Sequence, residues 1–151
     1  FLRSPVDGEV KNLRDWGIPL GRRFRALKLW FVIREQGIGG LQKRLRRDMA
    51  NARQFAETVA ATPGWRVLAP VHLQTVCVRH EPDGLKGEAL DAHTTSWVEA
   101  VNRSGAAYLT PAVLDGRWMA RVSIGALLTE EADVAAVWAA MREAADAAAG
   151  A

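Results

Sequence analysis

The spacing at which apolar residues recur changes along this chain, and this change restricts the possible fold classes more than any other feature. Apolar residues recur every three or four positions from residue 20 to residue 59, which predicts helices. Between residues 65 and 79 the period falls to two, which predicts strands. Asp115-Gly116 then separates two further strand patterns and is typical of a two-residue hairpin turn. The sequence therefore predicts an α+β fold.

The expected elements follow the order helix, helix, strand, strand, helix, strand, strand, helix. A first helix of about residues 21–36 should end at Gly37, Gly39 and Gly40, and a second should run from Leu41 to Val59. The later elements are expected as strands at 65–68 and 71–79, a helix at 87–103, strands at 107–114 and 117–124, and a helix capped by Thr129. This order favours a four-stranded, mostly antiparallel sheet with helices packed mainly on one face.

Two regions are expected from these patterns. Residues 1–20 carry prolines, glycines and charges but no core pattern, which indicates an arm. Residues 21–151 carry the periodic segments and should form one α+β domain.

Composition restricts the functional classes. Hydrophobic residues make up 49% of the 151 residues, which is enough for a core and too many for a disordered tail. The net charge of +3 mixes 20 basic with 17 acidic residues, so it does not by itself predict a nucleic-acid partner. A single cysteine, no apolar run long enough for a bilayer and no signal segment lead us to expect a cytoplasmic protein without a membrane partner.

The residues show no pattern of a self-contained catalytic or metal site. The three histidines are scattered, and Cys77 lies five positions from His72, so on one strand they would point to opposite faces. A set of Ser123, His93 and Asp91 has no nucleophile-elbow motif around it. Cys77 sits in an apolar strand and is expected to be a core residue rather than a nucleophile.

Two clusters of basic residues are each compatible with more than one role. Lys43-Arg44-Leu45-Arg46-Arg47 has no interleaved aromatic residues, which favours a solvated face or a subunit contact over base stacking. A second cluster, Arg22, Arg23, Arg25 and Lys28, lies where the arm meets the first helix. Its arginines suit the anchoring of a loop to carboxylates or phosphate, and equally a salt-bridged helix start. A stand-alone α+β binding or regulatory module with a basic face is the alternative function.

The run Pro-Leu-Gly-Arg-Arg-Phe-Arg-Ala-Leu-Lys-Leu-Trp, residues 19–30, resembles a specific family segment. It is similar to the segment that joins the large and small domains of the group II pyridoxal-phosphate decarboxylases, in the aromatic-L-amino-acid decarboxylase branch. Residues 108–111, 115–117 and 120–124 also resemble the final hairpin of that family. The resemblance covers nearly the whole chain.

The resemblance implies the small C-terminal domain of an aspartate-aminotransferase-like enzyme of PLP fold type I. The chain starts at Phe1 without a methionine, so we interpret it as a C-terminal portion whose first helix connects to a missing large domain. That upstream part would hold pyridoxal 5'-phosphate, since the family's cofactor-binding lysine, aspartate and histidine have no counterparts here. The intact parent would be a homodimeric carboxy-lyase for an amino acid, whereas the fragment alone is expected to be inactive.

The same resemblance assigns roles near the start of the chain. Residues 1–20 correspond to the mobile active-site loop and linker, and Gly21 to a substrate-pocket position where glycine leaves room for an aromatic ring. Leu13 stands where many members carry a tyrosine that returns a proton to the substrate carbon after carbon dioxide leaves. Leucine cannot donate a proton. Leu13 is therefore expected to mark aldehyde-forming chemistry, a decarboxylase with another acid, or an inactive relative.

Overall fold

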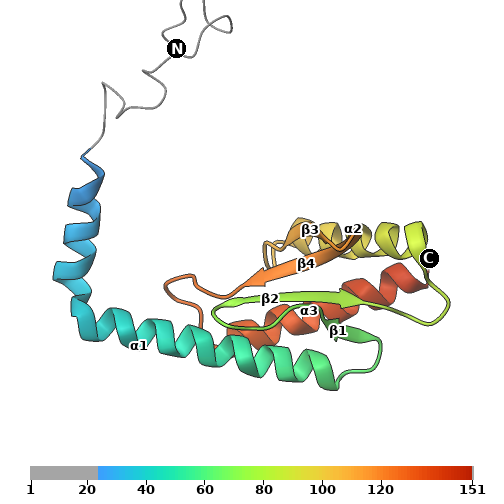
Figure 1. The fold of residues 1–151 in the computed structure, drawn as a ribbon, viewed down its shortest axis with the longest axis horizontal. Coiled ribbons are helices and arrows are strands. Elements are labelled where there is room, and N and C mark those ends of the chain that lie inside the picture. Colours follow the sequence, from blue (N-terminus) through green and yellow to red (C-terminus); the bar gives the residue numbers. More distant parts are fainter. Residues whose placement is uncertain (1–23, 151) are drawn as a thin grey trace, which may run out of the picture. The chain divides into compact units, whose positions relative to one another are not determined.

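The computed structural model describes residues 24–150, and the chain divides into two compact units, 1–41 and 42–151. The elements are α1 (Arg25–Ala61), β1 (Trp65–Val67), β2 (Thr75–His80), α2 (Gly87–Ser104), β3 (Thr110–Leu114), β4 (Arg117–Ser123) and α3 (Glu131–Ala149) (Figure 1). The predicted arm at 1–20 lies outside the described residues, so the predicted boundary after residue 20 stays a prediction.

In the first unit, the described residues belong mainly to the start of α1. Gly37 interrupts the helical backbone with φ 66° and ψ 168°, a conformation that glycine adopts readily because it has no Cβ. Helix continues on both sides of this residue, so the two predicted helices form α1 with a kink at Gly37. The glycine group was correctly predicted as a break, but only Gly37 has a non-helical backbone and Gly39 and Gly40 are helical.

The second unit contains the whole sheet. Its strand order is β1-β2-β4-β3, and every neighbouring pair is antiparallel. The registers place Val76 opposite Val122 and Val78 opposite Ala120, so these four side chains share one face. The predicted α+β fold with a four-stranded antiparallel sheet is confirmed.

One face of this sheet and the three helices share a single core. Val76, Val78, Ala120 and Val122 are at most 5% exposed. They belong to the same buried cluster as side chains from the helices, which are Ala52, Phe55 and Val59 of α1, Trp97, Val98 and Val101 of α2, and Val134, Met141 and Ala145 of α3. Helix α2 also packs against α3 and β4. The helices therefore cover the face to which these strand residues point, as predicted.

The core position predicted for Cys77 is wrong. Its thiol is free and half-buried. Because side chains alternate along a strand, the inward Val76 and Val78 direct Cys77 to the opposite face, where its cross-strand partner is Arg121.

The turns and caps follow local chemistry. Asp115 and Gly116 both have positive φ, 51° and 74°, which is the two-residue hairpin that the sequence predicts. The N-cap of α3 is Glu130 rather than the predicted Thr129. The Glu130 side chain accepts a bond from the Asp133 backbone, while Asp133 Oδ2 accepts one from the Glu130 amide at 2.8 Å. This reciprocal pair satisfies two donors that the helix start would leave free.

Candidate functional site

The site residues proposed from the sequence lie outside the described part of the chain. Leu13, Gly21, Arg22 and Arg23 all precede residue 24. Their roles as proton-donor position, substrate pocket and loop anchors stay predictions.

The basic cluster at 43–47 has a structural role in the second unit. Arg47 Nε and Nη2 donate to Asp48 Oδ1 at 3.2 and 3.1 Å, and Nη2 lies 3.3 Å from the carbonyl oxygen of Leu127. Asp48 is 1% exposed, so this guanidinium neutralises a buried carboxylate. Arg46 donates to Gln42 on the same helix. Arg46 and Arg47 therefore have partners within the chain.

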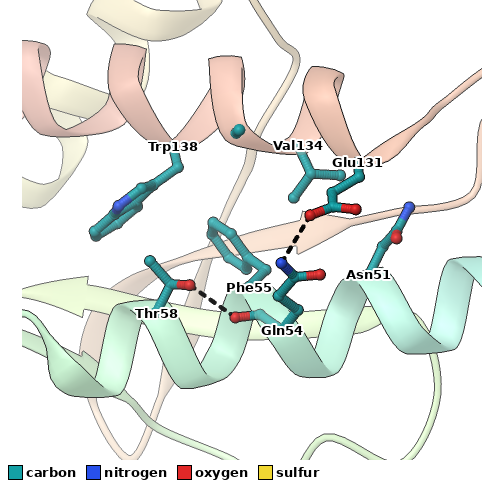
Figure 2. Close-up of a pocket in the computed structure, with 8 residues that line it drawn as sticks. Asn51, Gln54, Phe55, Thr58, Glu131, Val134 and Trp138 are labelled. Atoms are coloured by element: carbon teal, nitrogen blue, oxygen red, sulfur yellow. Dashed lines mark hydrogen bonds between the residues drawn. The ribbon is translucent and has the colours of Figure 1, made fainter.

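A small groove lies between the second-unit part of α1 and α3 (Figure 2). Phe55 and Trp138 face each other across it with ring centroids 5.8 Å apart, and its volume is about 100 Å³. Gln54 Nε2 donates to Glu131 Oε1 at 2.9 Å at the rim. Asn51 lines the groove and its buried Nδ2 has no hydrogen-bond partner. The lining offers an apolar floor and amide groups but a single carboxylate, so it does not supply a general acid–base pair.

Two histidines that are distant in sequence meet in the core. His80 Nδ1 lies 2.9 Å from His93 Nε2, and both residues are more than nine-tenths buried. The ring of His80 stacks on Trp65 with centroids 4.8 Å apart. This pair was not predicted from the sequence, although the residue pattern contains a signal for it. His80 shares the strand parity of Val76 and Val78, and His93 is on the inward stripe of α2 with Leu90 and Trp97.

Burial favours the neutral form of both histidines. Desolvation lowers the pKa of His80 below its usual 6.5, and the nearby His93 lowers it further while Asp146 acts in the opposite direction. Desolvation also lowers the pKa of His93, against a smaller raising effect of the Ala148 backbone. One neutral ring can then donate to the other, so the pair is suited to packing rather than to binding an anion.

Ser123, His93 and Asp91, the set considered above as a possible catalytic triad, each have a different partner. Asp91 Oδ2 accepts from Arg117 Nη1 at 3.1 Å, and its Oδ1 accepts from the Trp118 amide at 3.0 Å. That backbone bond is the main reason why the pKa of Asp91 is lowered, with the Arg117 bond adding to it. His93 contacts His80, and Ser123 contacts Thr75 at 3.3 Å. The structure therefore assembles no Ser-His-Asp site from these residues.

Comparison with known proteins decides the family. The sequence profile of the pyridoxal-dependent decarboxylase conserved domain matches residues 1–81, more than half of the chain. This chain belongs to the pyridoxal-dependent decarboxylase family. The resemblance read from residues 19–30 is thereby confirmed, and the fold is that of a domain from such an enzyme.

Individual decarboxylase relatives match almost the whole chain. A tryptophan decarboxylase from Camptotheca acuminata is 39% identical over 142 residues, which cover 91% of this chain and 28% of the relative. A phenylacetaldehyde synthase from a Rosa hybrid cultivar is 35% identical over 147 residues, covering 91% and 29%. The structure of Oryza sativa TDC with PLP and tryptamine superposes with a TM-score of 0.78 at 32% identity, covering 97% of this chain and 31% of that one. The chain thus spans less than a third of each relative.

The described residues of this decarboxylase domain do not fit pyridoxal phosphate. The three described lysines, Lys28, Lys43 and Lys86, are all exposed, and none lines the groove between α1 and α3. Within residues 24–150 no group of three or more His, Cys, Asp or Glu side chains could hold a metal ion. None of the described helices is long and apolar enough to cross a bilayer. Residues 24–150 thus include no buried lysine that could hold the cofactor as an imine.

Proposed function

We propose that this chain is the C-terminal part of a pyridoxal-phosphate-dependent decarboxylase that removes the α-carboxylate of an aromatic L-amino acid. The observation that carries this proposal is the similarity to a tryptophan decarboxylase over 91% of the chain, together with the shared fold. Residues 42–150 supply a domain built around a single core. The fragment alone should be inactive, and the homodimeric parent should be cytoplasmic, with an amino acid as its small-molecule substrate.

A second reaction outcome has its own support. Leu13 stands at the proposed proton-donor position, and leucine has no proton to give. Loss of a general acid typically costs about 10²–10⁴-fold in the step that it serves. One relative of this chain is a phenylacetaldehyde synthase. We therefore propose aldehyde formation as the alternative to amine formation in the intact enzyme.

The test uses a polypeptide that contains this chain together with the residues encoded upstream of Phe1. It is incubated with pyridoxal phosphate and, separately, with L-tryptophan, L-tyrosine, L-phenylalanine and L-glutamate as the non-aromatic control. Amine, aldehyde and carbon dioxide are quantified. Carbon dioxide release from the aromatic acids but not from L-glutamate is the expected result. A polypeptide that never develops the absorbance of bound cofactor would overturn the proposal.

The variant Leu13→Tyr separates the two outcomes. If Leu13 removes the proton donor, this substitution should raise the ratio of amine to aldehyde. Leu13→Phe is the matched control, because it adds the ring without the hydroxyl. Equal product ratios in the three proteins would show that residue 13 does not control the branch.

A further inference from the structure

The contact between His80 and His93 joins three elements of the second unit at one buried point. His80 is the last residue of β2 and His93 lies on α2, with 2.9 Å between His80 Nδ1 and His93 Nε2. The end of α3 reaches the same point, because the Ala148 backbone favours a charged His93 and the Asp146 carboxylate favours a charged His80. The packing of these three elements therefore depends on the protonation of the two rings.

The two rings can hold one added proton without moving apart. In the neutral pair one ring donates the shared hydrogen, so the outer nitrogen of that ring carries none. A proton added there turns the contact into a charge-assisted hydrogen bond, which is stronger than a neutral one. His93 Nδ1 has no hydrogen-bond partner among the described residues, although the Ala148 backbone is near enough to favour the charged ring. The carbonyl oxygen of Ala148 is one of the four at the end of α3 that accept no bond within the helix.

A second added proton removes the acceptor from the contact. Every ring nitrogen then carries a hydrogen, so two N–H groups face each other across 2.9 Å. The rings already influence each other in the folded chain, because His93 is, after desolvation, the next cause of the lowered pKa of His80. Two groups coupled in this way take up protons in two separate steps that belong to the pair. The doubly charged pair must separate.

The other charged side chains on the adjoining elements are paired with one another. The printed pairs join Glu81 to Arg66 of β1 and Arg79 of β2, and join Asp91 of α2 to Arg117 of β4. Among the described residues, Asp146 is the carboxylate that acts on the histidine pair. One carboxylate can balance one of the two positive charges, which supports the first step and not the second.

The end of α3 is the part of this arrangement that packing holds least. His80 lies on an interior strand opposite Trp65, and its ring stacks on the Trp65 indole with centroids 4.8 Å apart. Residues 144–149 are five alanines and one aspartate, and of these only Ala145 is buried. They bury little apolar area, and segments with few buried apolar contacts open most easily.

We propose that the His80–His93 contact is a two-step proton switch that controls the end of α3. The pair shares the first proton and keeps its geometry, whereas the second proton drives His93 away from His80 and releases residues 144–149. The release is local, because β2 and the first turns of α3 are held by core residues such as Val76 and Val134. The switch is independent of the reaction proposed for the parent enzyme.

Nitrogen-15 NMR of the imidazole rings tests the two steps. The variant His72→Gln removes the third histidine, so every remaining ring signal belongs to the pair. Long-range proton–nitrogen spectra are recorded between about pH 8 and about pH 4. Both rings should be neutral at the start, and the pair should take up two protons in steps at least about one pH unit apart. A single step in which both rings titrate together near the ordinary 6.5 would overturn the inference.

Carbon-13 shifts of the Cα atoms in the same samples show where helix is lost. Residues 144–149 should keep helical shifts through the first step and lose at least about half of their helical displacement in the second. Residues 131–141 of the same helix are the internal control and should stay helical. Retention of helix at 144–149 after both steps, or its simultaneous loss along the whole of α3, would contradict a local release.

The variant Asp146→Asn separates the switch from a general effect of acid. It removes the charge that favours a protonated His80, so the first step should move to lower pH. Glu143→Gln is the matched control, because Glu143 is an exposed carboxylate on the same helix and should leave both steps unchanged. An unchanged first step in Asp146→Asn, or an equal shift in the two variants, would refute the singly charged pair described above.

The variant His80→Phe keeps a ring beside Trp65 but carries no proton. His93 should then titrate in one step, and residues 144–149 should stay helical until the whole unit unfolds. Release of these residues at the same pH as in the unmodified chain would show that the pair does not control the end of α3.

Discussion

The two units of this chain place similar side chains in opposite environments. In residues 42–150, Trp97 is fully buried, and Trp65 is 6% exposed and stacks on His80. In residues 24–41, Trp30 is 53% exposed, with the edge of Phe31 and the guanidinium of Arg34 as its neighbours. The second unit buries a cluster of apolar side chains in its core, whereas no apolar residue in the described part of the first unit is fully buried. One unit is therefore built around a core, whereas the described part of the other has its large apolar side chains at the surface.

Replacement of one tryptophan in each unit should give the largest difference in the free energy of unfolding. Trp97→Ala removes a fully buried side chain and should lower the free energy of unfolding by about 3–5 kcal/mol. Trp30→Ala in the same chain should change it by no more than about 0.5 kcal/mol, because the ring is half-exposed. Urea denaturation followed by far-ultraviolet circular dichroism measures both. Similar losses for the two variants would show that residues 25–36 are packed in the chain alone.

Acidification should weaken the second unit through its histidine pair. His80 and His93 both have a pKa below the usual 6.5 because burial disfavours the charged ring. The unfolded chain therefore binds more protons than the folded chain just below that pH, so stability falls as the pH falls. Urea midpoints compared between about pH 7.5 and about pH 5.5 should decrease.

The exposed His72 provides the control for this pH effect. His72→Gln should retain the pH dependence of the unmodified chain, whereas His93→Gln should reduce it. A midpoint that does not change with pH in the unmodified chain would contradict the assignment of two neutral buried rings.

Glycine substitutions give the smallest expected changes in stability, and these changes have opposite signs in the two units. Gly116 has φ 74° in the hairpin, so Gly116→Ala should cost about 1 kcal/mol through backbone strain, although no atom lies within 4 Å of the added methyl group. Gly39 is helical with open space around it, so Gly39→Ala should stabilise its helix by up to about 1 kcal/mol. Urea denaturation measures the first and helix content by circular dichroism the second. A loss of helix content in Gly39→Ala would show that this position needs glycine.

Local patterns were sufficient to predict most of the second unit. The hairpin at Asp115-Gly116 could be predicted because positive φ at two adjacent positions requires particular residue types. The cap of α3 could be predicted only to within one residue, since Thr129 and Glu130 can both accept a backbone hydrogen bond. The position of Cys77 was predicted wrongly, because hydrophobic character was given more weight than strand parity.

The contact between His80 and His93 could not be predicted from local sequence patterns. The parity of β2 and the inward stripe of α2 each place one ring inside. That the two rings meet at 2.9 Å depends on how α2 lies across the sheet. No local pattern encodes this crossing, because it results from the packing of many side chains at once.

The sequence alone determined the family and the order of helical and strand segments, since residues 19–30 are specific and hydrophobic period follows backbone geometry. The tertiary structure decided which apolar residues are buried. The periodic patterns of α1 before and after Gly37 look alike in sequence, yet residues of the later part such as Phe55 are buried and residues of the earlier part such as Phe31 are exposed. Burial requires a facing surface, and only the folded chain shows whether that surface is present.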